Sequence, residues 1–227
     1  MKFKGFIFDF NGVLWWDSHL QENAWREFAK KKRGKDFGIE EMRIHMHGRP
    51  NKDIIEYLLG REVDGEKLDR LTEEKETVYR NICLSLGNGF KLSPGAIELL
   101  DFLVDNKIPH TIATSSEINN IKFFFESLNL QKWFDFNDVV YDDGTLPGKP
   151  APDIYLRASD RLRLAPEQCV VVEDAFSGIR SAQAAGIGLV IALGHKEKHK
   201  ELIEEAGADE AISNLGEIKK DELFFRI

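Results

Sequence analysis

The chain of 227 residues is 42% hydrophobic, which is enough to bury the core of one α/β domain, with or without a smaller insert. Its formal net charge of −8, from 39 acidic and 31 basic residues, disfavours binding to nucleic acid or anionic membranes, because both need a basic surface. No apolar run approaches the roughly 20 residues of a membrane-spanning helix.

The N-terminal sequence and the cysteines indicate a cytoplasmic protein. The segment MKFKGFIFDFNG has polar breaks and no small-residue cleavage site, so we expect a soluble, uncleaved chain. Cys83 and Cys169 form no spaced metal-binding set, and an isolated pair of this kind favours two free thiols over a disulfide.

Short apolar runs alternate with longer segments of helical periodicity, a pattern typical of βα units around a parallel sheet. Some runs are apolar at successive positions, as in Phe6-Ile7-Phe8 and Val170-Val171-Val172, which indicates strands covered on both faces. The predicted strands are 6–10, 110–114, 139–141, 169–173 and 189–193.

Residues from about 18 to 92 interrupt this alternation. They carry apolar residues at three-and-four spacing and no convincing strand, so we expect a helical insert. Turn residues cluster at both of its ends. The predicted domains are an α/β core, 1–15 and 93–227, and a helical domain, 16–92. The core is expected to resume with a helix from Pro94, with Ser93 as its N-cap.

The first motif that suggests a catalytic role is Asp9-Phe10-Asn11-Gly12, at the end of an apolar strand. The carboxyl ends of parallel strands are where ligands bind, and Asp9 there can attack a phosphoryl group to form an acyl phosphate. Gly12 allows the close backbone approach that such a loop needs. Taken alone, the same four residues are equally typical of an ordinary turn.

The second motif is Thr114-Ser115-Ser116, where another apolar strand runs into hydroxyl groups before a helix predicted from Ile118 to Leu128. Hydroxyls and free N–H groups at a helix N-terminus form an anion site, so Thr114 or Ser115 can bind phosphate. The other interpretation is that Ser115 or Ser116 caps the helix, and the two roles are compatible.

Two further motifs supply opposite charges. Lys149 is followed by Pro150 and Pro152, which constrain the chain and fix where its ammonium points, although a lone lysine is usually solvated. Glu173-Asp174 ends an apolar strand. Magnesium prefers one or two carboxylates beside phosphate oxygens, and Asp9 with Asp174 would provide them. Paired acids before a helix can also serve stability alone.

In this order, the four motifs resemble those of the haloacid dehalogenase superfamily, and the helical insert resembles the cap of its β-phosphoglucomutase-like branch. The resemblance implies an α/β fold: a doubly wound, Rossmann-like parallel sheet core with an inserted α-helical cap domain. It implies a magnesium-dependent enzyme that works through an aspartyl phosphate.

The resemblance also implies a role for each matching residue. The nucleophile would be Asp9, the phosphate ligand Thr114, and the charge stabiliser Lys149. Magnesium would be held by Asp9, Asp174 and the backbone carbonyl of Asn11, with Glu173 in the metal shell.

Asn11 departs from the family pattern. Family phosphatases and mutases carry an aspartate there that protonates the leaving oxygen and then activates water or a sugar hydroxyl. A carboxamide cannot move a proton near neutral pH, and such groups contribute about 10²–10⁴-fold to the rate. We therefore expect impaired turnover. Glu173, His19 or His47 are conceivable replacement bases.

The insert offers candidate substrate contacts. Arg49 and Lys52, in a loop that resembles the branch's substrate loop, can bind a second phosphate or sugar oxygens, or can simply be solvated. The branch has a histidine twelve residues after the nucleophile, and the residue here is Gln21, which weakens the mutase interpretation.

The leading functional hypothesis is hydrolysis of a small phosphorylated metabolite, a sugar phosphate by resemblance, at a rate reduced by Asn11. A phosphomutase and a weakly active protein that binds phosphorylated ligands are the alternatives. Whether Asn11 is natural or was introduced to trap a complex is left open by the sequence. We expect a monomer or a weak homo-oligomer, with no nucleic-acid or membrane partner.

Overall fold

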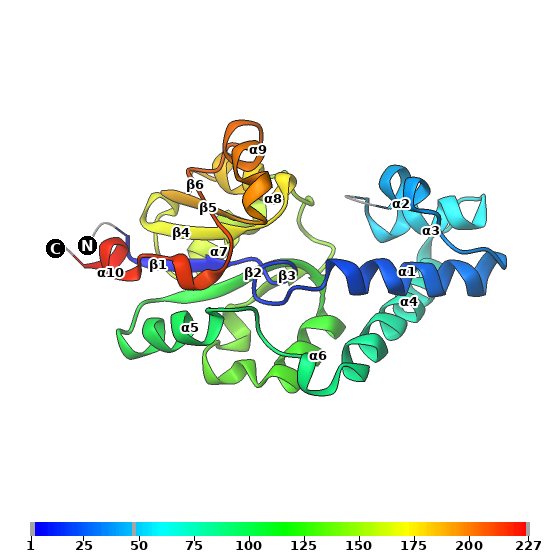
Figure 1. Cartoon of the computed structure of the whole chain (residues 1–227), viewed down its shortest axis with the longest axis horizontal. Helices are drawn as coiled ribbons and strands as arrows, with labels where there is room; N and C mark the ends of the chain where they lie inside the picture. Colours follow the sequence, from blue (N-terminus) through cyan, green and yellow to red (C-terminus); the bar gives the residue numbers. More distant parts are fainter. Residues whose placement is uncertain (1–2, 47–48, 226–227) are drawn as a thin grey trace. The chain divides into compact units, whose positions relative to one another are not determined.

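The computed structural model describes residues 3–46 and 49–225. The chain divides into two compact units (Figure 1): Met1–Trp16 with Lys91–Ile227, and Asp17–Phe90. We call the first the sheet unit and the second the helical unit. Within residues 3–46 and 49–225, no helix is both long enough and apolar enough to cross a membrane.

The sheet unit is built on six parallel strands in the order β3-β2-β1-β4-β5-β6. The strands are β1 (Gly5–Phe8), β2 (His110–Glu117), β3 (Val140–Asp142), β4 (Cys169–Glu173), β5 (Leu189–Leu193) and β6 (Glu210–Ile212). This confirms the predicted parallel α/β sheet. β4 and β5 have the predicted bounds, β1 ends two residues earlier, β2 continues three residues further, and β6 was not predicted.

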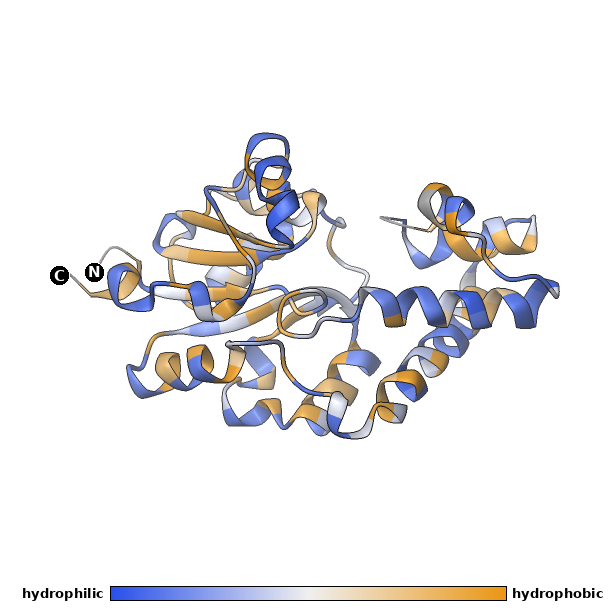
Figure 2. Ribbon diagram, in the orientation of Figure 1, coloured by the Kyte–Doolittle hydropathy of each residue, from blue (hydrophilic) through white to orange (hydrophobic). Residues whose placement is uncertain are grey.

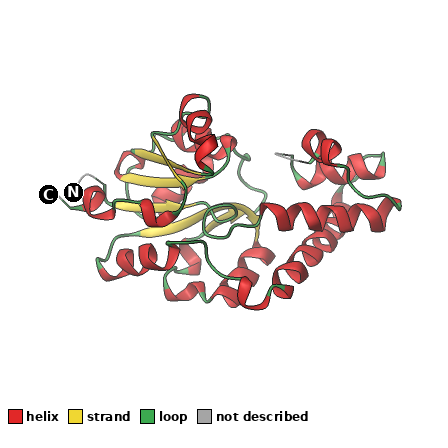
Figure 3. Cartoon of the chain, in the orientation of Figure 1, coloured by secondary structure: helices red, strands yellow, loops and turns green. Residues whose placement is uncertain are grey.

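Helices cover both faces of the sheet (Figure 3), as the uninterrupted apolar runs require. On one face, Ile7, Val171 and Val190 pack with residues of the helices 153–161, 176–184 and 199–204. On the other, Phe6 contacts Phe224 of the helix 220–224 at a ring distance of 6.2 Å. In Figure 2 the orange, hydrophobic colour is strongest on β4 and β5, whereas β2 carries white and blue positions.

The remaining elements of this unit connect the strands. The helices are α5 (Ala96–Asp105), α6 (Ile118–Leu128), α7 (Asp153–Arg161), α8 (Phe176–Ala184), α9 (His199–Glu204) and α10 (Lys220–Phe224). The 3₁₀ turns are η2 (Leu130–Lys132), η3 (Phe136–Asp138), η4 (Pro166–Gln168), η5 (Lys196–Lys198) and η6 (Leu215–Glu217). The helix from Ile118 to Leu128 has the predicted bounds.

The predicted start of α5 was wrong. The helix begins at Ala96 with Gly95 as N-cap, at a φ of 81°. Ser93, the predicted cap, instead donates its hydroxyl to the carbonyl of Val13 at 2.6 Å. A Cβ on Gly95 would lie 2.1 Å from the backbone nitrogen of Gly216, so a close contact between backbones decides the local geometry.

The helical unit consists of α1 (Ser18–Arg33), α2 (Ile39–His45), α3 (Asn51–Leu59), α4 (Gly65–Ser85) and the 3₁₀ turn η1 (Gly87–Gly89). Its described residues, 17–46 and 49–90, contain no strand. Trp25, Phe28, Phe37 and Ile55 belong to a separate apolar core in this unit. Periodicity at three-and-four spacing therefore correctly predicted helices here.

A buried polar network lies within the helical unit, between α1 and α4. The ammonium of Lys75, whose side chain is 2% exposed, donates to Gln21 Oε1 at 2.6 Å and to Glu76 Oε1 at 2.9 Å. The hydroxyl of Tyr79 donates to Asp17 Oδ2 at 2.6 Å, and Gln21 also reaches that oxygen. Burial of these charges is possible because each has a partner.

Cys83 and Cys169 are buried free thiols. The prediction of two thiols is confirmed. Burial raises the pKa of Cys169 to about 12, so this thiol stays protonated.

Candidate active site

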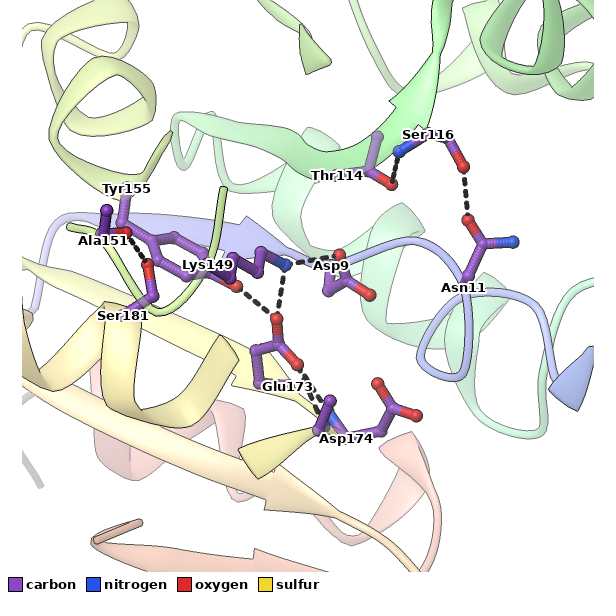
Figure 4. A network of polar contacts seen from close by, with 11 residues as sticks. Asp9, Asn11, Thr114, Ser116, Lys149, Ala151, Tyr155, Glu173, Asp174 and Ser181 are labelled. Atoms are coloured by element: carbon purple, nitrogen blue, oxygen red, sulfur yellow. Dashed lines mark hydrogen bonds and ion pairs between the residues drawn. The ribbon is translucent and has the colours of Figure 1, made fainter. Parts of the chain in front are cut away.

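The predicted motifs meet at the carboxyl edge of the sheet (Figure 4). Asp9 directly follows β1, Thr114 lies in β2, and Glu173 ends β4 with Asp174 next to it. β1 pairs with β2 on one side and with β4 on the other, all parallel, so their carboxyl ends lie together. Lys149 reaches the same place from the segment between β3 and α7.

Lys149 bridges two carboxylates. Its Nζ lies 2.8 Å from Asp9 Oδ1 and 2.5 Å from Glu173 Oε1, and all three side chains are at most 10% exposed. Burial raises the pKa of Asp9 to about 7, although the ammonium opposes this shift. Burial alone would lower the pKa of Lys149, but its two carboxylate partners outweigh burial and raise it. Lys149 is therefore a permanent cation beside the candidate nucleophile.

Glu173 makes four hydrogen bonds. Its Oε1 accepts from Lys149 and, at 2.7 Å, from the hydroxyl of Tyr155, while its Oε2 accepts from the backbone N–H groups of Asp174 and Ala175. A Cβ on Gly178 would lie 1.8 Å from Glu173 Oε1, so the first turn of α8 approaches this carboxylate directly.

Gly12 brings the loop after Asp9 against Asp174. Its φ is 82°, and a Cβ on it would lie 2.0 Å from Asp174 Oδ2. Only glycine accepts both conditions at once. The backbone of Gly12 therefore makes the close approach that was expected for this glycine, and the group it approaches is the Asp174 carboxylate.

Three carboxylates form a possible cation site. Asp9, Glu173 and Asp174 each offer an oxygen atom, and these atoms lie within 4.8 Å of one another. Hard oxygen donors at the end of a rigid sheet suit Mg²⁺ chemically. The donor set therefore fits the metal that the motifs imply.

The side chain of Asn11 points to the end of β2. Its Oδ1 accepts the hydroxyl of Ser116 at 2.6 Å (Figure 4). Ser116 was expected at most as a helix cap, and no pattern in the sequence pairs it with Asn11.

The hydroxyl residues of β2 divide into buried and exposed positions. Thr114 is 1% exposed, and its Oγ1 accepts the N–H of Ser116 at 3.1 Å. Ser115 is exposed. The capping interpretation of Ser115 and Ser116 was wrong, because β2 continues to Glu117, which takes the N-cap position of α6 without a side-chain cap.

The other candidate residues belong to the helical unit. Arg49 and His19 are exposed, and Lys52 is 53% exposed with its ammonium 3.9 Å from Glu56. His47 lies outside the described residues. Substrate contact by Arg49 and Lys52 stays a prediction.

Sequence reasoning missed two buried residues beside Lys149. Tyr155 donates to Glu173, and Ser181 donates its hydroxyl to the carbonyl of Ala151 at 2.6 Å (Figure 4). Both are on the apolar faces of helices, where tyrosine and serine are ordinary core residues. Tyr155 lies six residues after Lys149, and this spacing indicates a role for the tyrosine only after the lysine has been assigned to the site.

A parallel sheet with an aspartate, a lysine and an acidic pair at its carboxyl edge is the arrangement that the four motifs predicted for an α/β hydrolase. A model of the haloacid dehalogenase-like hydrolase family matches residues 3–186, and the chain belongs to this family. The family expected from the four motifs is confirmed.

Two of the similar proteins are named as phosphatases of phosphorylated sugars. A phosphorylated carbohydrates phosphatase from Thermotoga maritima is 32% identical over 206 residues, covering 89% of this chain and 90% of that protein. The fructose-1-phosphate phosphatase YqaB of Escherichia coli is 31% identical over 193 residues, covering 83% of this chain and 96% of the relative.

Solved structures of the same family share the fold. A HAD hydrolase, family IA, variant 3 from Entamoeba histolytica is 39% identical with a TM-score of 0.89, covering 97% of both chains. A putative beta-phosphoglucomutase from Thermotoga maritima is 28% identical with a TM-score of 0.73, covering 94% of this chain and 95% of the other. The likeness to the β-phosphoglucomutase branch is therefore also found in structure.

Proposed function

We propose that this chain is a magnesium-dependent phosphatase that acts on a small phosphorylated metabolite, a sugar phosphate, through an aspartyl phosphate on Asp9. The observation that carries the proposal is the buried contact of Lys149 with Asp9 at the carboxyl edge of the sheet, 2.8 Å from ammonium to carboxylate. The carbohydrate phosphatases among its relatives support the substrate class.

The first step transfers the phosphoryl group to Asp9. A carboxylate oxygen of Asp9 forms a bond to phosphorus as the bond to the leaving oxygen breaks, and the alcohol departs as an alkoxide unless a proton reaches it. Lys149 neutralises charge that spreads over the phosphoryl oxygens. Thr114 and Ser115 would bind those oxygens at the end of β2. Water then attacks phosphorus, the bond between Asp9 and phosphorus breaks, and inorganic phosphate leaves with the protons of the water, which regenerates the Asp9 carboxylate.

Mg²⁺ would be held by Asp9, Asp174 and the backbone carbonyl of Asn11, with Glu173 in the surrounding shell. When bound, the metal neutralises charge on the phosphate. The fit rests on the three carboxylates whose oxygens lie within 4.8 Å.

Asn11 would lower turnover in both steps. Its carboxamide can donate or accept a hydrogen bond, but it neither protonates the leaving oxygen nor activates water. The first step suffers least with substrates whose leaving group departs readily without a proton.

We further propose that residues 16–92 act as a cap over the phosphoryl site of the core, 1–15 and 93–227, and that Arg49 and Lys52 contact the substrate. A cap would exclude water and strengthen the electrostatic interactions with phosphate. Both side chains are cationic and exposed on the helical unit. Arg49→Ala is expected to raise KM more than it lowers kcat.

The test is a phosphatase assay with Mg²⁺ on a panel of phosphomonoesters, with Asn11→Asp beside the unmodified protein. We expect weak activity that Asn11→Asp increases by about 10²–10⁴-fold, and none in the Asp9→Ala variant. Absence of activity from both the unmodified and the Asn11→Asp protein would overturn the proposal.

A second candidate is a protein that binds phosphorylated ligands without turning them over, which the carboxamide at position 11 favours. It predicts that Asp9→Ala leaves ligand affinity largely intact and that Asn11→Asp adds no activity. Calorimetric titration with hexose phosphates distinguishes the two functions.

A further inference from the structure

Glu173 has no acceptor position left for another ligand. A carboxylate has about four lone-pair sites. Lys149 and Tyr155 occupy Oε1 at 2.5 and 2.7 Å, and the N–H groups of Asp174 and Ala175 occupy Oε2 at 2.9 and 3.1 Å. The residue is 1% exposed, so water does not compete for these sites. A metal ion could bind Glu173 only after one of these donors left.

Tyr155 contacts both members of the Lys149–Glu173 ion pair. Its hydroxyl donates to the same Oε1 that accepts from Lys149, and the Lys149 Nζ lies 5.2 Å from the centre of its ring. The side chain is fully buried in the first turn of α7. The ring thus stabilises the cation while the hydroxyl holds its anionic partner.

The donation from Tyr155 also affects where the ammonium rests. Lys149 lies between Asp9 Oδ1 and Glu173 Oε1, and a hydroxyl donor on Oε1 reduces the pull of Glu173 on the lysine. The loop that carries Lys149 is held from another side by Ser181 of α8, which donates to the carbonyl of Ala151. Figure 4 shows Tyr155, Glu173, Lys149 and Asp9 joined by successive contacts, with the contact of Ser181 and Ala151 beside them.

We propose that Tyr155 is a positioning residue for phosphoryl transfer, which keeps the Lys149 ammonium on Asp9, and that Glu173 anchors this lysine and does not coordinate the metal. Metal binding then falls to Asp9, Asp174 and the carbonyl of Asn11. The inference rests on the proposed function and replaces the expectation that Glu173 belongs to the metal shell.

The positioning role is tested by a double-mutant cycle with Tyr155→Phe and Lys149→Ala, measured in the Asn11→Asp background with p-nitrophenyl phosphate. We expect Tyr155→Phe to lower kcat about tenfold to a hundredfold with KM within about threefold, and to have no further effect once Lys149 is alanine. An equal loss from Tyr155→Phe in both backgrounds would refute positioning through the lysine. Tyr141→Phe is the matched control, expected to leave kcat unchanged.

A second readout does not need activity. The ammonium protons of Lys149, observed by ¹⁵N nuclear magnetic resonance, should exchange with water faster in Tyr155→Phe than in the unmodified protein. Unchanged exchange would refute the proposal even if no phosphatase activity were found. Absence of activity with increased exchange would instead overturn the proposed function and leave the positioning role supported.

The claim about metal ligands is tested by comparing Glu173→Gln with Asp174→Asn, each of which removes one negative charge. Titration with Mg²⁺ alone should show at least about tenfold weaker binding for Asp174→Asn than for Glu173→Gln, because only the first would lose a ligand. Equal losses in the two variants would overturn the claim that Glu173 does not coordinate the metal.

Discussion

At the scale of single residues, the proposed mechanism makes the carboxamide of Asn11 the group that limits which substrates can react. It accepts a hydrogen bond from Ser116 at 2.6 Å and carries no proton that it can transfer near neutral pH. Lys149 remains on Asp9, so the proposed nucleophile keeps its cationic partner. Formation of the proposed aspartyl phosphate would then depend on how easily the leaving oxygen departs as an anion.

We therefore predict a steep dependence on leaving group. The unmodified protein should turn over p-nitrophenyl phosphate at least about 10²-fold faster than a hexose 6-phosphate, because a nitrophenolate leaves without a proton. Asn11→Asp should raise kcat for the hexose phosphate much more than for the aryl phosphate. Steady-state kinetics on both substrates measure the ratio, and an equal gain on the two would contradict the argument.

Gly12 gives a second prediction at this scale. Gly12→Ala would place a methyl group 2.0 Å from Asp174 Oδ2 at a φ of 82°, so Asp174 or the loop must shift. We expect about tenfold weaker Mg²⁺ binding and at least about 1 kcal/mol of lost stability. Calorimetric titration and urea unfolding measure these quantities.

Gly144 provides the control for Gly12. Its φ is 73°, and a Cβ there would meet nothing within 4 Å, so Gly144→Ala carries the backbone cost without the collision. Gly144→Ala should lose about 1 kcal/mol and bind Mg²⁺ normally. If both variants bound Mg²⁺ normally, the contact between Gly12 and Asp174 would be unimportant for the metal.

At the scale of elements, the network between α1 and α4 gives a stability prediction. Lys75→Ala leaves the carboxylate of Glu76, which is 7% exposed, without its ammonium partner. Breaking a buried pair in this way costs about 3–5 kcal/mol. Urea unfolding followed by circular dichroism measures the loss.

The comparison for Lys75 is Lys31, whose ammonium is paired to Glu74 but whose side chain is 63% exposed. Lys31→Ala should change the free energy of unfolding by less than about 1 kcal/mol. Similar losses for the two variants would mean that burial of Lys75 adds nothing to the free energy of unfolding.

Arg33, Glu41 and Tyr57 connect three helices and make stability depend on pH. Two hydrogen bonds from Arg33 and one from Tyr57 reach Glu41, and chiefly the Arg33 bond lowers the pKa of Glu41 from 4.5 to about 2. A lowered pKa in the folded state stabilises the fold above the unfolded pKa. This stabilisation is lost as pH falls from about 4.5 through about 2.

Glu41→Gln should accordingly be less stable than the unmodified protein by about 1 kcal/mol at pH 7. The difference should shrink as pH falls below 4.5, which is the ordinary pKa of a glutamate carboxyl. Thermal melting between pH 7 and pH 3 measures it. A difference that stayed constant over this range would assign the loss to packing instead of charge.

The elements that sequence reasoning found are those whose hydrophobic pattern is local. β4 begins with four apolar residues and ends at Glu173, and β5 is an apolar run between two glycines, and the bounds of both were predicted without error. β6 has three residues at the edge of the sheet and no such run, so it was missed. The role of Ser93 was mistaken because its partner, Val13, lies 80 residues away.

At the scale of the whole molecule, the motif residues are spread along the chain and are brought together by strand order. Asp9 and Asp174 are far apart in sequence, but β1 pairs directly with β4, so a parallel sheet places both at one edge. The sequence could predict this much, because the rule for strand ends is general. Tyr155 and Ser181 could not be predicted, since their partners depend on helix packing against the sheet.

Because the chain has two units, the effect of Mg²⁺ on the stability of each unit can be measured separately. All of the proposed Mg²⁺ donors belong to the sheet unit, and the helical unit has its own apolar core. A ligand stabilises what it binds, by an amount that grows with the logarithm of its concentration over Kd. Mg²⁺ should therefore slow amide exchange at β1 and β4 and not in α2, and excess chelator should reverse this. Hydrogen exchange measured by mass spectrometry on the full chain makes the comparison. Equal protection in α2 and β4 would mean that the metal acts beyond its proposed donors in the sheet unit, and protection in neither would remove magnesium from the proposed mechanism.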